Sequence, residues 1–292
     1  MVFLRQQQDE CAKNPGHPDF IPFQAFTVKH LPQQFQDNDI FELIKTIGDL
    51  TVRLSVTHVS VSRPEVFPET ITPFPYNDKK GSNELRTATG WVDKVRKYSE
   101  YSEKFCPCEQ CLASENPSKV WGELHVITAA HVVFDDNEAK HTSFRWGFNE
   151  HESPVVTFKG GHVRDIDPLA DRCTVVCVTC DLGLIDKAIC TLAQRDSLHK
   201  KIQEKDRGLD ENDNLVVVVS HPHGFPKQVT VGFWTERNLG TNNETRYVYT
   251  ASTCPGSGGA PVYILSRNGL PSYHCHSGYS PHKGNFSCVW LG

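Results

Sequence analysis

Two kinds of hydrophobic spacing divide the chain into an N-terminal helical segment and a long β-rich remainder. Over residues 37–47 apolar side chains recur every three or four positions, which predicts an amphipathic helix that Gly48 ends. Over residues 50–56 apolar and polar side chains alternate instead, and β-type patterns continue from Arg86 onward. Residues 64–84 hold four prolines and predict a loop.

The β-rich remainder is expected to form many short strands in two groups. The predicted strands are residues 88–95, 121–128, 155–158, 173–178, 182–185, 215–220, 228–234, 247–250, 261–265 and 273–277. A charged stretch, residues 187–213, predicts a helix between the two groups. This pattern predicts an all-β fold of two stacked antiparallel barrels or a sandwich. We place an N-terminal extension at residues 1–49, a first barrel at about 50–190 and a second barrel at about 214–292.

Composition narrows the classes of function. Lys and Arg total 30 against 35 Asp and Glu, a net charge of −5 without a basic block, which argues against a dedicated nucleic-acid binder. The longest apolar run, residues 215–219, is too short to cross a membrane, and the first residues lack the apolar core of a signal peptide. We therefore expect no membrane partner and a cytoplasmic or nuclear location.

The chain has 11 cysteines, and three of them, Cys106, Cys108 and Cys111, lie within six residues. In a reducing compartment such spacing favours free thiols or a metal over disulfides. A structural zinc would suit a loop that cannot build a core. The fourth ligand stays open among Cys173, Cys177, Cys180 or a histidine, and three unliganded thiols are the alternative.

Three segments carry the residue types that nucleophilic acyl transfer needs, which are a base, an acid that orients it and a hydroxyl. His131 follows an apolar strand and two alanines. Asp181 stands among apolar residues, where an unpaired charge would be costly. Ser257 lies in a glycine-rich turn that can direct two N–H groups at one point.

The stretches Thr128–His131, Asp181–Leu184 and Gly256–Gly259 resemble the histidine, aspartate and serine motifs of the trypsin-like serine proteases, in the same order. Ser220–Pro226, followed by Val229–Gly232, resembles a strand pair of the HtrA-type and glutamyl-endopeptidase-type members. The resemblance implies two six-stranded antiparallel β-barrels with a helical connector. It also implies a serine endopeptidase that cleaves proteins or peptides through an acyl-enzyme, with no cofactor needed for catalysis.

The same resemblance assigns a substrate-binding strand at His276, Ser277 and Gly278. In glutamyl-endopeptidase-type members a histidine at the position of His276 binds an acidic substrate side chain. An ordinary strand histidine is the alternative for His276.

The serine motif leaves two registers open. In the family, the oxyanion-hole N–H groups belong to the nucleophile and to the residue two before it. With Ser257 as the nucleophile and its N–H as one donor, the second position falls on Pro255, which has no N–H. The other register makes Gly256 a donor but puts Gly258 where the serine should stand. We therefore expect either an endopeptidase built on His131, Asp181 and Ser257, with Gly256 and Ser257 forming the oxyanion hole, or a pseudoprotease that binds peptides.

Overall fold

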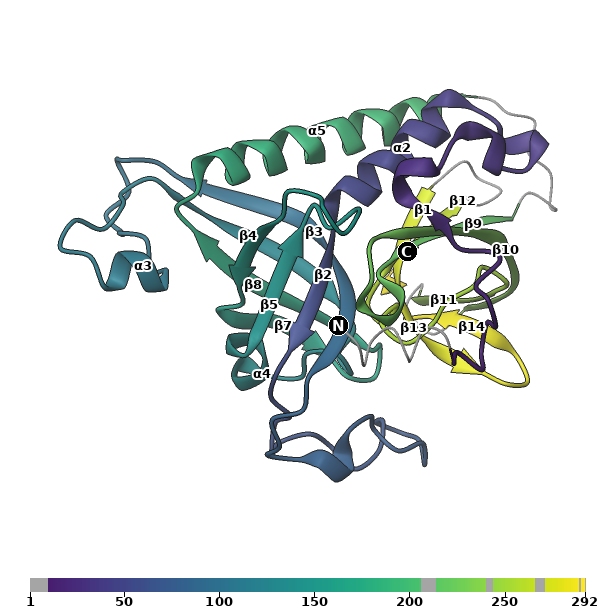
Figure 1. Ribbon diagram of the computed structural model, residues 1–292, viewed down its shortest axis with the longest axis horizontal. Helices are drawn as coiled ribbons and strands as arrows, with labels where there is room; N and C mark the ends of the chain where they lie inside the picture. Colours follow the sequence, from purple (N-terminus) through teal and green to yellow (C-terminus); the bar gives the residue numbers. More distant parts are fainter. Residues whose placement is uncertain (1–9, 206–213, 240–243, 266–270, 289, 292) are drawn as a thin grey trace.

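Two β-structures stand side by side in the computed structural model, with helices crossing one end of both (Figure 1). The structure describes residues 10–205, 214–239, 244–265, 271–288 and 290–291. The all-β double-barrel architecture expected from the sequence is confirmed in this part of the chain. Trp91 and Ile127 of the first sheet meet Cys275 and Cys288 of the second in the seam between them.

The first sheet is a curled, antiparallel half-barrel in the strand order β6-β5-β2-β3-β4-β8-β7. Its strands are β2 (Thr51–Val56), β3 (Arg86–Tyr98), β4 (Trp121–Thr128), β5 (Thr142–Trp146), β6 (Val156–Lys159), β7 (His162–Asp167) and β8 (Arg172–Thr179). Alternate residues of these strands, such as Val52, Leu54, Leu124 and Val126, fill one core. The cysteine-rich insertion lies between β3 and β4, as the sequence predicts, and contains the short helix α3 (Glu109–Leu112).

The second sheet closes on itself, because β10 pairs with β9 on one side and β11 on the other. The closed barrel follows the order β10-β9-β12-β13-β14-β11, and β1 and β15 add to its edges. Its strands are β1 (Ile21–Pro22), β9 (Leu215–Ser220), β10 (Gln228–Leu239), β11 (Glu244–Tyr249), β12 (Pro261–Leu265), β13 (Pro271–Ser280), β14 (Gly284–Ser287) and β15 (Trp290–Leu291).

Strand β9 is apolar throughout because both of its faces are covered. Val216 and Val218 point into the barrel core. Leu215, Val217 and Val219 point outward against the N-terminal segment and the helices. Successive side chains of a strand alternate between its faces, so an unbroken apolar run requires partners on both.

Two longer helices cover the barrels at one end (Figure 1). Helix α2 (Asn38–Leu50) packs against α5 (Leu182–Glu204), the connector between the barrels. The remaining helical elements of the described residues are α4 (Asp136–Lys140) and the 3₁₀ turns Phe23–Ala25, Val28–His30, Gln33–Phe35, Asn77–Lys79 and Pro222–Gly224.

Two details of the helices differ from the sequence prediction. Gly48 lies inside α2 and does not end it. Its lack of a side chain serves packing instead, because a Cβ there would stand 2.0 Å from the Phe23 ring that packs on the helix. The predicted strand over residues 182–185 is the first turn of α5. Its apolar residues face the first-barrel core once per helical turn, and Leu184 is one of them.

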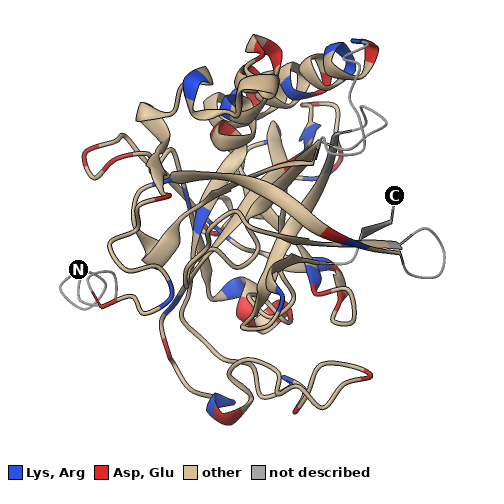
Figure 2. Ribbon diagram, turned by 90° about the vertical axis from the view of Figure 1, so that its right-hand side faces the viewer, with Lys and Arg blue, Asp and Glu red and all other residues tan. Residues whose placement is uncertain are grey.

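Lys and Arg residues are interspersed with Asp and Glu residues along the described chain (Figure 2), and α5 contains both kinds. None of the described helices combines the length and the apolar character that crossing a membrane requires.

Candidate functional site

His131 lies in the turn that follows β4, at the seam between the barrels. The N–H groups of Val132 and Val133 donate to Ala129 O and turn the chain sharply there. The two alanines are fully buried, and the histidine side chain keeps 17% of its surface exposed. The imidazole therefore stands at the edge of the core with one side open.

Asp171 is the acid that orients this imidazole. Its carboxylate lies 2.8 Å from His131 Nδ1 and accepts the His131 backbone N–H at 2.9 Å. It also accepts the hydroxyl of Ser277 from the second barrel. The side chain is only 3% exposed, and its backbone adopts a left-handed φ of 58° in the turn between β7 and β8. These bonds hold Nδ1 protonated and leave Nε2 free on the opposite side of the ring.

The prediction that Asp181 plays this role is wrong. Asp181 is the N-cap of α5, and its Oδ1 accepts the Leu184 N–H at 3.0 Å. A carboxylate just before an apolar helical segment is a typical N-cap. An N-cap aspartate and an aspartate that orients a histidine can both stand next to apolar residues, so the sequence around Asp181 does not tell the two roles apart. Asp171 sits among other acids in a turn, so no local pattern in the sequence distinguishes it from Asp165 or Asp167.

The serine loop is held in place from the first barrel. Thr89 of β3 donates its hydroxyl to Gly256 O at 2.7 Å and its N–H to Gly258 O at 3.0 Å. Gly256 and Gly259 have φ angles of +94° and +78°, which side chains rarely adopt. A Cβ on Gly259 would also lie 2.1 Å from Thr128 Oγ1. Both glycines are therefore required by the shape of the loop.

Gly258, and not Ser257, faces the imidazole. A Cβ built on Gly258 would stand 2.8 Å from His131 Nε2. The Ser257 side chain is fully buried, with its Oγ 3.1 Å from Ser220 Oγ and 3.3 Å from the Cys254 N–H that donates to it. No hydrogen bond joins Ser257 to His131 among the described residues. The structure thus brings His131 and the loop together without placing the predicted hydroxyl on the base.

The N–H groups at the loop follow the second of the two registers. Ser257 and Gly259 donate theirs to Cys254 O and His276 O, at 2.9 and 2.8 Å. The N–H groups of Gly256 and Gly258 donate to no acceptor among the described residues. Free donors at these two positions match the family's oxyanion-hole spacing when Gly258 occupies the nucleophile position.

A cleft of about 640 Å³ opens beside His131 and Asp171. Loop residues Phe67, Pro73 and Pro75 line one wall, and Ser277, Gly278 and Tyr279 of β13 line another. His276 lies behind this wall, 4% exposed, with Nδ1 2.6 Å from the Tyr249 hydroxyl. Burial lowers the pKa of His276 well below its usual value, so the ring is neutral at neutral pH. Two of the three predicted substrate-binding residues therefore line the cleft.

A buried ion pair anchors both the His131 turn and the wall of the cleft. Arg63 and Glu138 have fully buried side chains and are joined by bonds of 2.6 and 2.7 Å. Arg63 Nη1 donates to His131 O at 3.0 Å and to Pro75 O at 2.8 Å. Burial alone would raise the pKa of Glu138, but bonds from Arg63 lower it below the usual value. Sequence reasoning missed this pair because its partners lie 75 residues apart.

The cysteine cluster gains a fourth member in the folded chain. Cys106, Cys108 and Cys111 meet Cys180, which lies between β8 and α5, with all four sulfur atoms within 4.8 Å of one another. Cys108 and Cys180 are separated by 3.9 Å between sulfur atoms. Two other candidates for the fourth ligand, Cys173 and Cys177, lie in the first-barrel core.

The two aspartates give a direct test of the corrected assignment. We expect Asp181→Ala to lower the free energy of unfolding by about 1 kcal/mol through the lost cap and to leave the His131 imidazole unchanged. Asp171→Asn should alter the ¹⁵N shifts of that imidazole, because the carboxylate no longer fixes its tautomer. Imidazole NMR and chemical denaturation of both variants are the measurements. An altered His131 spectrum in Asp181→Ala alone would contradict the assignment.

Comparison with known proteins supports the family relationship. A model of the trypsin-like peptidase domain matches residues 117–269, which include His131, Asp171 and Gly258. No curated protein matches the sequence. Among solved structures, Deg5 is 11% identical, with a TM-score of 0.43 over 88% of this chain and 90% of that chain. The active form of the Rv3671c protease from M. tuberculosis is 13% identical, with a TM-score of 0.41 over 86% and 79% of the two chains. Because the family model covers more than half of the sequence, the chain belongs to the trypsin-like peptidase family.

Proposed function

We propose that this chain is a pseudoprotease, a trypsin-like domain that binds a protein or peptide segment in its cleft without cutting it. The observation that carries the proposal is the position of Gly258, whose Cβ would lie 2.8 Å from His131 Nε2. Acyl transfer needs a nucleophile in contact with the base. A glycine has no atom that can form the acyl-enzyme.

The backbone at Gly258 does not itself require glycine. The positive φ angles of the loop belong to Gly256 and Gly259, and Gly258 is not among them. A serine is therefore compatible with the backbone at this position. Its Cβ, 2.8 Å from His131 Nε2, requires the His131 ring to shift, and the ring has an exposed side. Only the hydroxyl is lacking from an otherwise supported arrangement of base, orienting acid and free N–H groups.

Gly258→Ser should therefore create reactivity towards a fluorophosphonate. In that reaction the new serine oxygen bonds to phosphorus, fluoride leaves, and His131 takes the serine proton. We expect no labelling of the wild type and labelling of Gly258→Ser that exceeds background on the order of 10²-fold or more, since loss of a serine nucleophile costs on the order of 10⁶ in turnover. Gel fluorescence with the labelled probe measures both.

Two control variants separate this proposal from an active endopeptidase. Gly258→Ala adds the same Cβ without the oxygen and should stay unlabelled. Adding His131→Gln to Gly258→Ser should abolish the labelling. The proposal fails if the wild type is labelled and Ser257→Ala removes the label, because Ser257 would then be the nucleophile.

Peptide binding is supported by the cleft beside the base. The cleft offers the partly buried residues Ser277 and Gly278 and the half-exposed ring of Tyr279, over which Lys13 Nζ lies at 4.3 Å. An aromatic side chain at the mouth of a pocket contributes contact area at low entropic cost. A protein or peptide is the ligand class that this family's fold serves.

Tyr279→Ala should weaken a peptide selected by phage display against the wild type by about tenfold or more, a typical effect of truncating an aromatic contact. Titration calorimetry with the selected peptide gives the affinity. Tyr101→Ala is the matched control, because Tyr101 is 89% exposed in the cysteine-rich insertion and does not line the cleft. Equal loss in both variants would exclude the cleft as the binding site.

The cluster of Cys106, Cys108, Cys111 and Cys180 is proposed to hold a structural zinc. Four thiolates around a tetrahedral zinc with Zn–S of about 2.3 Å lie about 3.8 Å apart, and Cys108 and Cys180 are 3.9 Å apart. The Ser118 N–H donates to Cys111 Sγ at 3.5 Å, a contact that would stabilise a metal-bound thiolate. The cytoplasmic or nuclear location expected from the sequence would keep these thiols reduced and available to a metal.

Cys108→Ser should lose one equivalent of zinc relative to the wild type, measured by elemental analysis of purified protein. Zinc binding orders a loop that has few core contacts of its own, so proteolysis within residues 99–120 should become faster. Cys190→Ser is the control, because Cys190 is exposed and lies outside the cluster. Unchanged zinc in Cys108→Ser would rule out this site.

A further inference from the structure

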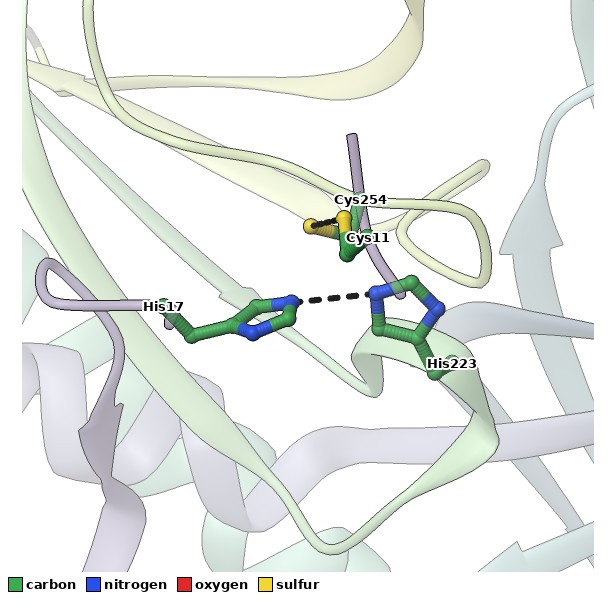
Figure 3. Close-up of side chains that lie close together, drawn as sticks. All are labelled: Cys11, His17, His223 and Cys254. Atoms are coloured by element: carbon green, nitrogen blue, oxygen red, sulfur yellow. Dashed lines mark hydrogen bonds between the residues drawn. The ribbon is translucent and has the colours of Figure 1, made fainter. Parts of the chain in front are cut away.

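A second group of sulfur and nitrogen ligands lies apart from the cysteine-rich insertion. It consists of Cys11, His17, His223 and Cys254, whose ligand atoms all lie within 4.8 Å of one another (Figure 3). We propose that these four side chains bind a tetrahedral zinc ion that fastens the N-terminal arm to the loop bearing Gly258. The ligands are two thiols and two imidazoles from three separate parts of the chain.

The spacing of the ligands fits a tetrahedral ion. With Zn–S of about 2.3 Å and Zn–N of about 2.0–2.1 Å, neighbouring ligand atoms stand about 3.3–3.8 Å apart. Cys11 Sγ and Cys254 Sγ are 3.6 Å apart, and the Nε2 atoms of His17 and His223 are 3.1 Å apart. Both imidazoles turn the same ring nitrogen towards the centre, with the ring planes 87° apart (Figure 3). Two sulfurs and two nitrogens in this geometry are typical of zinc.

The backbone is arranged to bring the two imidazoles together. His17 and His223 have φ angles of 51° and 54°, and each stands beside a glycine that also has a positive φ, Gly16 and Gly224. A left-handed conformation is costly for a residue other than glycine and persists where its surroundings impose it. Both histidines carry this strain, and it directs both rings at the same point.

The surroundings of the sulfur atoms match those of a metal-bound thiolate. Asn14 Nδ2 donates to Cys254 Sγ at 3.1 Å and to Thr253 O at 2.9 Å. Cys11, Cys254 and His223 are buried, so the two sulfur atoms would carry charge only when a cation is bound between them. Two thiolates balance the charge of a divalent ion. Amide donors to ligating sulfur are the kind of outer-shell contact that stabilises such sites.

The location of the group links the N-terminal arm to the proposed pseudoactive site. Cys254 immediately precedes Pro255 and Gly256, and the His223 N–H donates to Pro255 O at 2.5 Å. A Cβ on Gly256 would lie 2.8 Å from His223 N, so the two turns are in close contact. A metal bound here holds the turn that presents the Gly256 N–H. It also ties down an arm whose Cys11 is 243 residues away from Cys254 in the sequence.

Zinc stoichiometry in a Cys108→Ser background tests the proposal. That background removes the other cluster, so the remaining metal reports this one. In protein purified under reducing conditions from zinc-supplemented medium, we expect Cys108→Ser to retain one equivalent. Adding Cys254→Ser or His17→Gln should remove it, whereas adding Cys190→Ser should not. His17 is half-buried on the arm, so its substitution is the variant least able to disturb folding. Far-ultraviolet circular dichroism checks the fold.

Cobalt substitution provides an independent readout in the same background. Co²⁺ should give a thiolate-to-cobalt charge-transfer band that disappears when Cys254→Ser is added. Hydrogen exchange of residues 10–20 should accelerate after chelation, because the arm loses its tether. The proposal is wrong if folded Cys108→Ser carries no metal, if Cys254→Ser and His17→Gln retain it, or if alkylation and mass spectrometry find Cys11 and Cys254 joined in a disulfide.

Discussion

The carboxylate of Asp171 is the contact on which the arrangement of the site depends. It binds the backbone N–H and Nδ1 of His131 and accepts the hydroxyl of Ser277 from the other barrel. One buried group thus fixes the tautomer of the imidazole, its direction and its position against the second barrel. A buried carboxylate needs such donors, because an unpaired charge in the core is costly. The remaining contacts of the site support this one from both sides of the seam.

The support from the first barrel is a buried polar network around Glu138. Glu138 accepts bonds from Arg63 and from the N–H groups of Ser60 and Phe134, and Arg63 binds the carbonyl of His131. Glu138 also lies 3.3 Å from Arg86, so removing Glu138 would leave two buried guanidinium groups without an acid. Breaking a buried ion pair in this way typically costs about 3–5 kcal/mol. Thr89 extends the support across the seam to the carbonyls of Gly256 and Gly258. The loop and the His131 imidazole are therefore held in fixed positions relative to each other without any bond between Ser257 and His131.

The proposed binding of a protein or peptide segment suits a site in which base, acid and loop are held in place and no described hydroxyl is hydrogen-bonded to the base. The orienting acid and the base line the cleft. The proposed zinc site at Cys11, His17, His223 and Cys254 would hold the neighbouring loop, which carries the two N–H groups that have no acceptor among the described residues. Preorganisation of this kind lowers the entropic cost of binding a flexible ligand. The proposed zinc of the cysteine-rich insertion would not hold the serine loop, because the insertion with α3 lies at the end of the first barrel that is away from the second barrel (Figure 1).

The sequence by itself determined most of the strands, the double-barrel class, the positions of His131 and the glycine-rich loop, and three of the four cysteines of the first cluster. These features depend on periodicity and on residues close together in the chain. Only the tertiary structure decided between Asp171 and Asp181, because a helix cap and an orienting acid need the same residue type and differ in what lies opposite them. It likewise distinguished Gly258 from Ser257 by their distance to His131, and brought Cys11 and His17 to His223 and Cys254. Contacts between residues far apart in sequence leave no local pattern, since they arise from how the barrels pack.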